Sequence, residues 1–466
     1  MEPNQQIVEA SDVCRRKFCQ AIATAPLLAI AGCGGWDSAD PAAVTPIGLR
    51  QTIPLGEAWA SSSINVSVFR EQSVLRIGSG DYLAAYVDPT GELCLHQITV
   101  HGVTVRRVAV VPRLSNALLK DGHCSANLGL SSDRQLHVMY GAHDTLPYYA
   151  CIPLDDFQAL PNGSSITARR WSTTISYPQF YQVGGTLQMW FRADPANEVH
   201  RLTYDATAAA WAASSELLLT PGSAERVYMN QLAVLGNRVA LPWLYRLVST
   251  DDLVRNEGLW LAMSVDAGHR WTTAGGQLLN WPVTRGDVSA LVSVPSEKQL
   301  LNQTSSRFGP DGRLYLTWYA QDAEKHHQVM MTTVSPAGQV MGNEAISDSK
   351  NNFDLLGRGT LVLPLSRPQL VVSDRFVHVV YRQDNQLVVA SRSSADNPGS
   401  AAWRYLRLDV GDLLAWEPSI SSMHWEIDRE LVVFVQPANQ GQLDTSSPTP
   451  AQRASLYVFT EEPARS

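Results

Sequence analysis

Two histidines frame one short segment of the chain, and imidazole is the side chain that best exchanges protons near neutral pH. Between His123 and His143, apolar residues alternate with others over 126–130, and an apolar-rich run follows at 136–140. These patterns predict two β-strands, and the polar run Ser-Ser-Asp-Arg at 131–134 predicts a turn between them. An antiparallel hairpin brings together the residues just outside its two strands. We therefore expect the two imidazoles to share one site.

The same hairpin pattern recurs along the chain at intervals of roughly 50–70 residues, which is the self-similarity of a propeller array. Seven copies stand at 73–87, 124–141, 177–192, 229–246, 302–320, 367–382 and 417–437. One such unit cannot bury both faces of its sheet, so neighbouring units must cover one another around an axis. The 13 Trp, 31 Gly and 26 Pro suit short strands and tight turns. We predict an all-β fold, a seven-bladed β-propeller, because two stacked sandwiches would not need so regular a repeat.

The sequence divides into three segments. Residues 1–32 read as a targeting signal, 33–59 as a tether of small and polar residues, and 60–466 as the propeller. Few residues follow the apolar run at 457–459 in the last repeat. We therefore expect a strand near 63–69 to complete the seventh sheet and close the ring.

The first segment has the pattern of an exported lipoprotein. Arg-Arg-Lys-Phe at 15–18 matches a twin-arginine signal, and the apolar run at 21–31 is too short to span a bilayer stably. That run leads to Ile-Ala-Gly-Cys, which resembles a bacterial lipobox with Cys33 as the acylated residue. An ordinary buried helix is the alternative. We expect export in the folded state and a lipid anchor on a periplasmic or cell-surface membrane face. Gly34 stands where Asp would retain a lipoprotein at the inner membrane, which favours the outer membrane.

Charge and cysteine content limit the partners that the protein can have. The formal net charge of −8 argues against general binding of nucleic acid. Cys94, Cys124 and Cys151 remain beyond the signal and Cys33, and three cysteines allow at most one disulfide. Cys124 follows His123, but a small buried residue explains it better than a metal ligand. No Cys/His cluster has zinc spacing, so we expect catalysis without a cofactor. A structural ion is left open. We also expect the protein to be a monomer.

One turn carries a structural motif. Residues 264–271 fit the pattern Ser-x-Asp-x-Gly-x-x-Trp, the Asp-box of sialidase-like propeller blades. Its Asp266 would cap amides of the turn, and its Trp271 would pack between blades. We therefore expect Asp266 to be structural and not catalytic.

The innermost strands of a propeller all present one end to the axis, so ligand-binding residues would come from the starts of several repeats. The residues at those positions are rich in His, Tyr, Arg and Asn: His123, His143, Tyr177, Arg192, Tyr228, Asn230, Trp243, Tyr245, Arg246, Asn302, Arg367 and Glu417. Glycoside hydrolysis usually needs two carboxylates, and this set offers one. Elimination from a uronic acid needs a cation for the carboxylate, a base and an acid, which Arg, His and Tyr supply.

The chain resembles the BNR-repeat propeller family that includes ulvan lyases, which are polysaccharide lyases acting on a sulfated algal polymer of rhamnose and uronic acid. The resemblance spans about residues 70–440. It is carried by the hairpin from Asp-Gly-His at 121–123 to the Tyr-Tyr pair after His143, by the block from Ser-Tyr-Pro to Phe-Arg at 176–192, and by the Asp-box. The resemblance implies that His123 and Tyr177 act as base and acid, and that Arg192 and His143 neutralise the uronate carboxylate. Cys124 departs from the family pattern, in which Asn is expected.

We therefore expect a polysaccharide lyase that cleaves an acidic, ulvan-like sulfated polysaccharide by β-elimination, with Arg192 lowering the pKa of Tyr177. Arg and its polar neighbours suit sulfate and carboxylate groups, so the expected substrate-binding residues are Tyr228, Asn230, Tyr245, Arg246, Asn302 and Arg367. A non-catalytic glycan-binding lipoprotein is the main alternative. A sialidase-like hydrolase ranks third, because no arginine triad beside a Tyr/Glu pair is apparent.

Overall fold

The computed structural model describes residues 46–65, 72–248, 254–355, 363–400, 402–439 and 450–462. The expected export signal at 1–32, Cys33 and the first part of the expected tether lie outside these residues. Within the described ranges, no helix is long and apolar enough to cross a bilayer.

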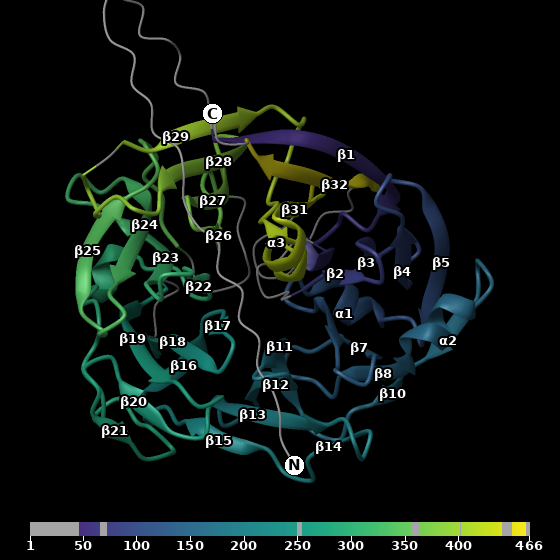
Figure 1. Ribbon diagram of the computed structural model, residues 1–466, viewed down its shortest axis with the longest axis horizontal. Coiled ribbons are helices and arrows are strands. Elements are labelled where there is room, and N and C mark those ends of the chain that lie inside the picture. Colours follow the sequence, from purple (N-terminus) through teal and green to yellow (C-terminus); the bar gives the residue numbers. More distant parts are fainter. Residues whose placement is uncertain are drawn as a thin grey trace, which may run out of the picture. The chain divides into compact units, whose positions relative to one another are not determined.

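Seven antiparallel sheets surround a common axis as the blades of a β-propeller (Figure 1). Blade 1 contains β2 (Val74–Ile77), β3 (Asp81–Val87), β4 (Leu93–Ile98) and β5 (Thr104–Val111), and β9 (Ser165–Thr167) pairs in parallel with β5. Blade 2 contains β6 (Ala126–Leu130), β7 (Gln135–Tyr140), β8 (Tyr148–Pro153) and β10 (Arg169–Arg170). Blade 3 contains β11 (Ile175–Val183), β12 (Thr186–Ala193), β13 (Glu198–Asp205), β14 (Ala210–Trp211) and β15 (Glu216–Leu219).

The remaining four blades complete the ring. Blade 4 contains β16 (Glu225–Met229), β17 (Ala233–Leu235), β18 (Arg238–Leu247), β19 (Asn256–Ser264), β20 (Trp271–Thr273) and β21 (Leu278–Leu279). Blade 5 contains β22 (Ser306–Phe308), β23 (Leu314–Gln321), β24 (His327–Val334) and β25 (Val340–Ala345). Blade 6 contains β26 (Gln369–Val372), β27 (Phe376–Gln383), β28 (Gln386–Ser393) and β29 (Arg404–Leu408). Blade 7 contains β30 (Ser419–Ile420), β31 (Glu430–Val435), β32 (Gln452–Glu461) and β1 (Ile47–Ala58).

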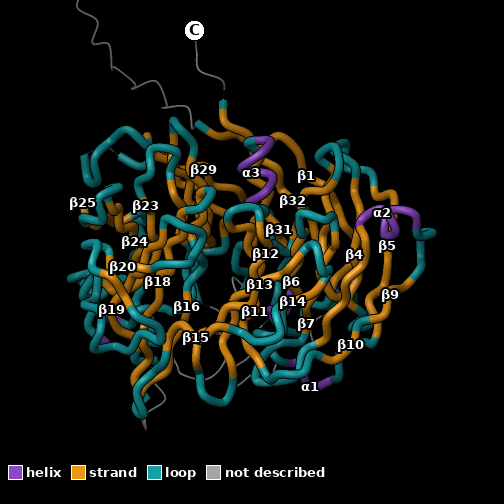
Figure 2. Tube along the Cα trace, turned by 60° about the horizontal axis from the view of Figure 1, so that its bottom comes forward, coloured by secondary structure: helices purple, strands orange, loops and turns teal. Residues whose placement is uncertain are grey.

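The predicted fold is confirmed, since each of the seven predicted hairpins falls on the inner strands of one blade. The short helices α1 (Asn116–Lys120), α2 (Leu154–Ala159) and α3 (Ser422–Asp428) and the 3-10 turns η1 (Ser63–Asn65) and η2 (Ser296–Lys298) lie between strands. Helix α3 interrupts the seventh hairpin, where the sequence pattern predicted strand. Near the axis, α1 and α3 lie at opposite ends of the propeller (Figures 1 and 2).

The ring is closed by β1 and not by the predicted strand near 63–69. Strand β1 pairs antiparallel with β32 from Ile47 opposite Glu461 to Ala58 opposite Gln452. Residues 63–65 form η1, and 66–69 lie outside the described residues. Pro and Gly gave residues 47–58 the composition of a tether, but Pro is tolerated in an edge strand, where its missing amide costs no ladder bond. The expected tether boundary at 59 is therefore wrong.

The core lies between the blades. Trp271 of the Asp-box is 1% exposed, and its ring lies edge-on to Trp190 of blade 3 with the centroids 5.9 Å apart. The Asp266 carboxylate accepts the backbone amide of Arg270 at 2.9 Å. Both contacts confirm the structural role predicted for this motif. Cys124 is buried, as predicted, and none of the three cysteines in the described ranges forms a disulfide.

Candidate active site

The β6–β7 hairpin places His123 and His143 side by side, as its sequence pattern predicted. Strand β6 pairs with β7 from Ala126 opposite Tyr140 to Leu130 opposite Leu136. The two imidazole rings stack with their centroids 4.3 Å apart and their planes 26° apart. Their side chains are 15% and 22% exposed, so both are partly open to solvent.

One carboxylate holds both imidazoles. Oδ1 of Asp121 lies 2.9 Å from Nδ1 of His123, and Oδ2 lies 2.5 Å from Nδ1 of His143. Burial alone would raise the pKa of Asp121, but hydrogen bonds from the two histidines hold it well below its ordinary value. Nδ1 of each ring therefore faces the carboxylate, and Nε2 is the nitrogen on the far side of each ring from Asp121. Asp121 was not among the predicted site residues, although an acidic residue two positions before His123 was a usable signal.

Blade 3 contributes Tyr177 through a bulge in β11. The pairing of β11 with β12 shifts between Ser176 and Gln179, and Tyr177 has a φ of 56°. A left-handed conformation is unfavourable for a residue with a side chain, and such bulges re-aim side chains at active sites. Here the bulge brings the Tyr177 hydroxyl to 3.3 Å from Nε2 of His143.

Arg192 lies behind this tyrosine, at the end of β12. Its guanidinium carbon is 4.9 Å from the ring centroid of Tyr177 and 5.4 Å from that of Tyr228. Nε donates to Asp194 at 3.0 Å, and Nη2 donates to the Ser176 hydroxyl at 3.3 Å. Nη1 is buried and has no hydrogen-bond partner among the described residues. One donor of this cation therefore remains to be satisfied.

Burial and nearby guanidiniums set the pKa values of the two central tyrosines. Burial raises the pKa of Tyr177, and this effect outweighs the lowering by Arg192. Arg192 acts in the expected direction, but the expected net lowering of the Tyr177 pKa is wrong. Burial also acts to raise the pKa of Tyr228, but the guanidiniums of Arg246 and Arg192 outweigh it and leave that pKa below its ordinary value.

Two of the predicted substrate-binding residues join this centre. The ring centroids of Tyr228 and Tyr177 lie 6.3 Å apart, and the guanidinium of Arg246 lies 4.5 Å from the Tyr228 ring. Asn302 is linked to this centre through Arg246, because its side-chain oxygen accepts a hydrogen bond from Nη2 of Arg246 at 2.8 Å.

The other three predicted binding residues are engaged elsewhere. The side-chain oxygen of Asn230 accepts the backbone amide of Thr304 at 3.2 Å. Tyr245 is fully buried edge-on to Trp260, in the core between blades 3 and 4. Arg367 donates through Nη1 to both oxygens of Glu417, at 2.8 and 2.7 Å. We call the group of Asp121, His123, His143, Tyr177 and Arg192 the His/Tyr/Arg centre. The structure does not bring Asn230, Tyr245 or Arg367 to this centre.

The same centre contains a set of atoms that could coordinate a cation. Asp121, His123 and His143 each offer one ligand atom, and these atoms lie within 4.8 Å of one another. Imidazole nitrogen and carboxylate oxygen are ligands that zinc accepts. Asp121 already receives hydrogen bonds from both rings, so its oxygens are satisfied by the protein itself.

Fold and site together define a seven-bladed propeller with a buried His/Tyr/Arg centre where two blades meet at one end of the axis. The model of the BNR repeat-containing family matches residues 82–340, which is more than half of the chain. The chain therefore belongs to this family. No curated protein sequence matches it.

Solved structures share the fold at low sequence identity. The polysaccharide lyase Uly1 has a TM-score of 0.62 and 11% identity over 88% of this chain and 99% of its own. A PL25 ulvan lyase has a TM-score of 0.59 and 13% identity over 86% and 95% of the two chains. The structure of a PL25 ulvan lyase bound to -[GlcA(1-4)Rha3S]- has a TM-score of 0.60 and 12% identity over 87% and 96%. At this identity the likeness establishes the common fold of these chains.

Proposed function

We propose that this protein is a polysaccharide lyase that cleaves an acidic, uronate-containing and ulvan-like sulfated polysaccharide by β-elimination. The observation that carries the proposal is the contact of Tyr177 with His143, with Arg192 behind the tyrosine and Asp121 behind the histidines. The shared fold with ulvan lyases supports it, and so does the oligosaccharide named with one of them.

Elimination begins with a proton that is hard to remove. The hydrogen on C5 of a uronate becomes acidic only when its carboxylate is neutralised. Arg192 carries a buried charge and a buried donor atom that has no partner among the described residues, and His143 lies on the other side of Tyr177. In the proposed complex the substrate carboxylate is held by Arg192 and His143. Arg192 is only 6% exposed, so this contact requires the overlying tyrosine rings to shift when substrate binds.

The two proton transfers then fall to different groups. A tyrosine is ordinarily neutral at pH 7, and burial raises the pKa of Tyr177 further, so this residue holds the proton that an acid must supply. His123, with Nδ1 held by Asp121, is suited to be the base through Nε2. The C5–H bond breaks and its proton goes to His123. The C4–O4 bond breaks as the C4=C5 double bond forms, and the leaving oxygen takes the proton of Tyr177.

The carboxylates near the site argue against a hydrolase. A glycoside hydrolase usually needs two carboxyl groups that face the scissile bond. Asp121 accepts both histidines, and Asp194 accepts Arg192 and the Ser176 hydroxyl. Neither carboxylate is placed to act on a glycosidic oxygen. A glycan-binding protein without catalytic activity remains the competing function, because it would use the same residues for binding alone.

One assay separates the three functions. The mature protein is incubated with ulvan and with related uronate polymers while absorbance near the band of an unsaturated uronate is followed. A lyase raises both the absorbance and the number of reducing ends. A hydrolase raises the reducing ends alone, and a binding protein changes neither. Absence of the absorbance change with every polymer tested would refute the proposed activity.

We also propose that the protein is exported through the twin-arginine route and anchored by lipid on Cys33, with the outer membrane favoured. The proposal rests on the sequence pattern around that cysteine. Labelled fatty acid should be incorporated by the unaltered protein and not by Cys33→Ser, and the variant should leave the membrane fraction. Equal labelling of both would refute the anchor.

A further inference from the structure

A cavity lies at the other end of the axis from the His/Tyr/Arg centre. Its volume is about 430 Å³, within the roughly 300–1,000 Å³ of small-molecule sites. Tyr177 stands near the start of β11, and Tyr181, which lines this cavity, stands four residues further along that strand. At roughly 3.3 Å per residue the two tyrosines are well separated. Helix α3 forms another wall, whereas α1 precedes Asp121 at the opposite end (Figure 2).

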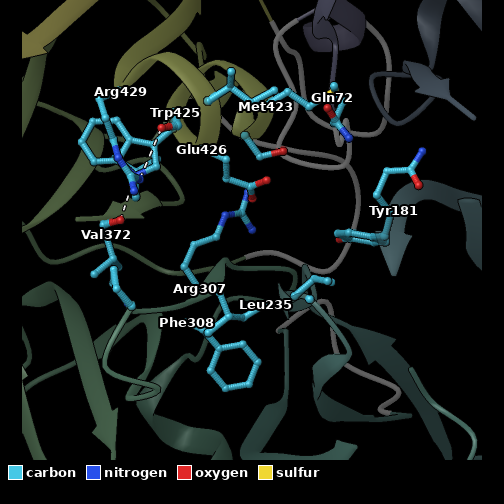
Figure 3. Close-up of a pocket in the computed structure, with 17 residues that line it drawn as sticks. Gln72, Tyr181, Leu235, Arg307, Phe308, Val372, Met423, Trp425, Glu426 and Arg429 are labelled. Atoms are coloured by element: carbon cyan, nitrogen blue, oxygen red, sulfur yellow. Dashed lines mark hydrogen bonds between the residues drawn. The ribbon is translucent and has the colours of Figure 1, made fainter. Parts of the chain in front are cut away.

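Three polar side chains face the interior of this cavity. Arg307 and Glu426 extend toward its middle from opposite walls, and Gln72 lies at a third wall (Figure 3). Gln72 is 5% exposed, and its side-chain oxygen has no hydrogen-bond partner among the described residues. A buried carbonyl oxygen without a donor is costly, so a ligand that donates a hydrogen bond there would be stabilised.

Glu426 offers a second acceptor, and its side chain is exposed to solvent. Partial desolvation raises the pKa of its carboxyl group, although the guanidiniums of Arg307 and Arg429 act to lower it. Arg429 is held against Trp425, with its guanidinium carbon 5.9 Å from the indole ring and Nη1 donating to the Trp425 carbonyl.

The remaining walls are apolar. Leu235 is 40% exposed and Ile427 is 56% exposed, and both line the cavity together with Met423. A ligand for this cavity needs hydroxyl groups for Gln72 and Glu426, and it needs C–H surface for the apolar walls. The two arginines and one glutamate leave a net positive charge, so an anionic group is also favoured. A sugar that carries a carboxylate or sulfate meets all of these requirements.

We propose that this cavity binds one acidic sugar residue, with hydroxyls on Gln72 and Glu426 and the anionic group on Arg307. The site is separate from the residues assigned to elimination, and it depends on the proposed function only for the choice of glycan. It would let the protein hold a second piece of the polymer or a released product while the first mouth is occupied.

The test uses the full mature chain with Tyr177→Phe, in which cleavage of the oligosaccharide should be slowed by roughly 10²–10⁴-fold. Titration calorimetry with an oligosaccharide of glucuronate and rhamnose 3-sulfate should show two binding events for each protein. Adding the near-isosteric pair Gln72→Met and Glu426→Met should weaken one event at least tenfold and leave the other. Equal affinities with and without the pair, or a single event in the parent, would overturn the proposal.

Two further measurements make the result decisive. If the methionine pair unfolds, Leu235→Asp on the exposed rim should weaken the same event by repelling the anionic group. Glycine and free arginine serve as amino-acid probes, and binding of these without binding of glucuronate would overturn the choice of a sugar. With Tyr177 intact, the methionine pair should keep the initial rate of absorbance increase. Binding without any absorbance change would refute the lyase and leave the second site standing.

Discussion

The phenolic oxygen of Tyr177 lies 3.3 Å from Nε2 of His143, although the two residues come from neighbouring blades. The histidine follows the β6–β7 hairpin, and the tyrosine stands in the bulge of β11. The contact therefore exists only where two blades meet. The contact completes a chain from the carboxylate of Asp121, through the imidazole of His143, to the hydroxyl group of Tyr177, which lies beside Arg192.

Replacing that hydroxyl group should remove the acid. Tyr177→Phe keeps the ring against Arg192 and deletes the proton that the leaving oxygen would take. We expect kcat to fall by roughly 10²–10⁴-fold, the usual contribution of a positioned acid or base. Initial rates of absorbance increase measure this. Tyr381→Phe is the matched control. The Tyr381 hydroxyl lies buried in blade 6 with no hydrogen-bond partner in the described part of the chain, so its loss should leave the rate unchanged.

Asp121→Asn should affect both catalysis and stability. An amide oxygen can accept from one ring at most while its NH₂ group faces the other, so the imidazoles lose their common anchor. We expect kcat to fall at least about tenfold with a smaller change in KM. Asp205→Asn, at an exposed turn, is the control.

The pH dependence of stability gives an independent check on Asp121. Its folded pKa is depressed, so its contribution to the free energy of unfolding is present above the unfolded carboxyl pKa of about 3.9 and is lost as the pH falls below that value. The difference in urea unfolding between wild type and Asp121→Asn should therefore shrink from pH 6 toward pH 3. A difference that stays constant over this range would contradict the assignment.

Chelation should leave catalysis intact. The proposed elimination uses Arg192 and His143 for the carboxylate and needs no cation on the ligand set of Asp121, His123 and His143. We expect the rate of absorbance increase to be unchanged after dialysis against a chelator. Loss of activity that is restored by zinc would instead assign these three residues as metal ligands.

Ring closure can be tested by two truncations. Removing residues 1–45 leaves β1, so the unfolding midpoint should stay the same. Removing residues 1–58 deletes β1 and uncovers one edge of β32. Ile47 and Ile53 are fully buried and Leu55 is 6% exposed, and their burial contributes roughly 5 kcal/mol. Similar midpoints for the two truncations would show that β1 does not close the ring.

A buried histidine in blade 1 should make the fold sensitive to acid. His96 is 6% exposed, stacks on Tyr86 and has no partner for either ring nitrogen in the described ranges. Burial lowers its pKa to about 4, with Arg107 acting the same way. The unfolded chain binds this proton near pH 6.5, so the contribution is full above that pH and is lost as the pH falls toward 4.

The variant His96→Phe removes this titration. Wild type should lose up to roughly 1.4 kcal/mol of unfolding free energy for each pH unit below 6.5 that the variant does not lose. Urea unfolding at pH 7 and pH 5 measures the difference. Equal losses in both proteins would show that His96 is not buried as a neutral group.

Much of the fold could be predicted because propeller repeats are local patterns. A contiguous run of alternating residues indicates each hairpin, and seven such hairpins predict seven blades. The stacking of His123 on His143 is equally local, since one hairpin determines it. The closing strand β1 could not be recognised in the same way. Its partner β32 lies at the other end of the chain, and its Pro and Gly residues are also typical of a tether.

The sequence by itself determined the propeller, the pairing of the two histidines and the residue types around the mouth of the axis. Only the tertiary structure decided which of those residues meet. Arg246 reaches Tyr228, whereas the next residue back, Tyr245, faces the opposite side of its strand into the core. Arg367 is held by Glu417 from another blade. The tertiary structure also decided the pKa of Tyr177. Burial between blades raises this pKa more than Arg192 lowers it, and no local sequence pattern predicts that burial.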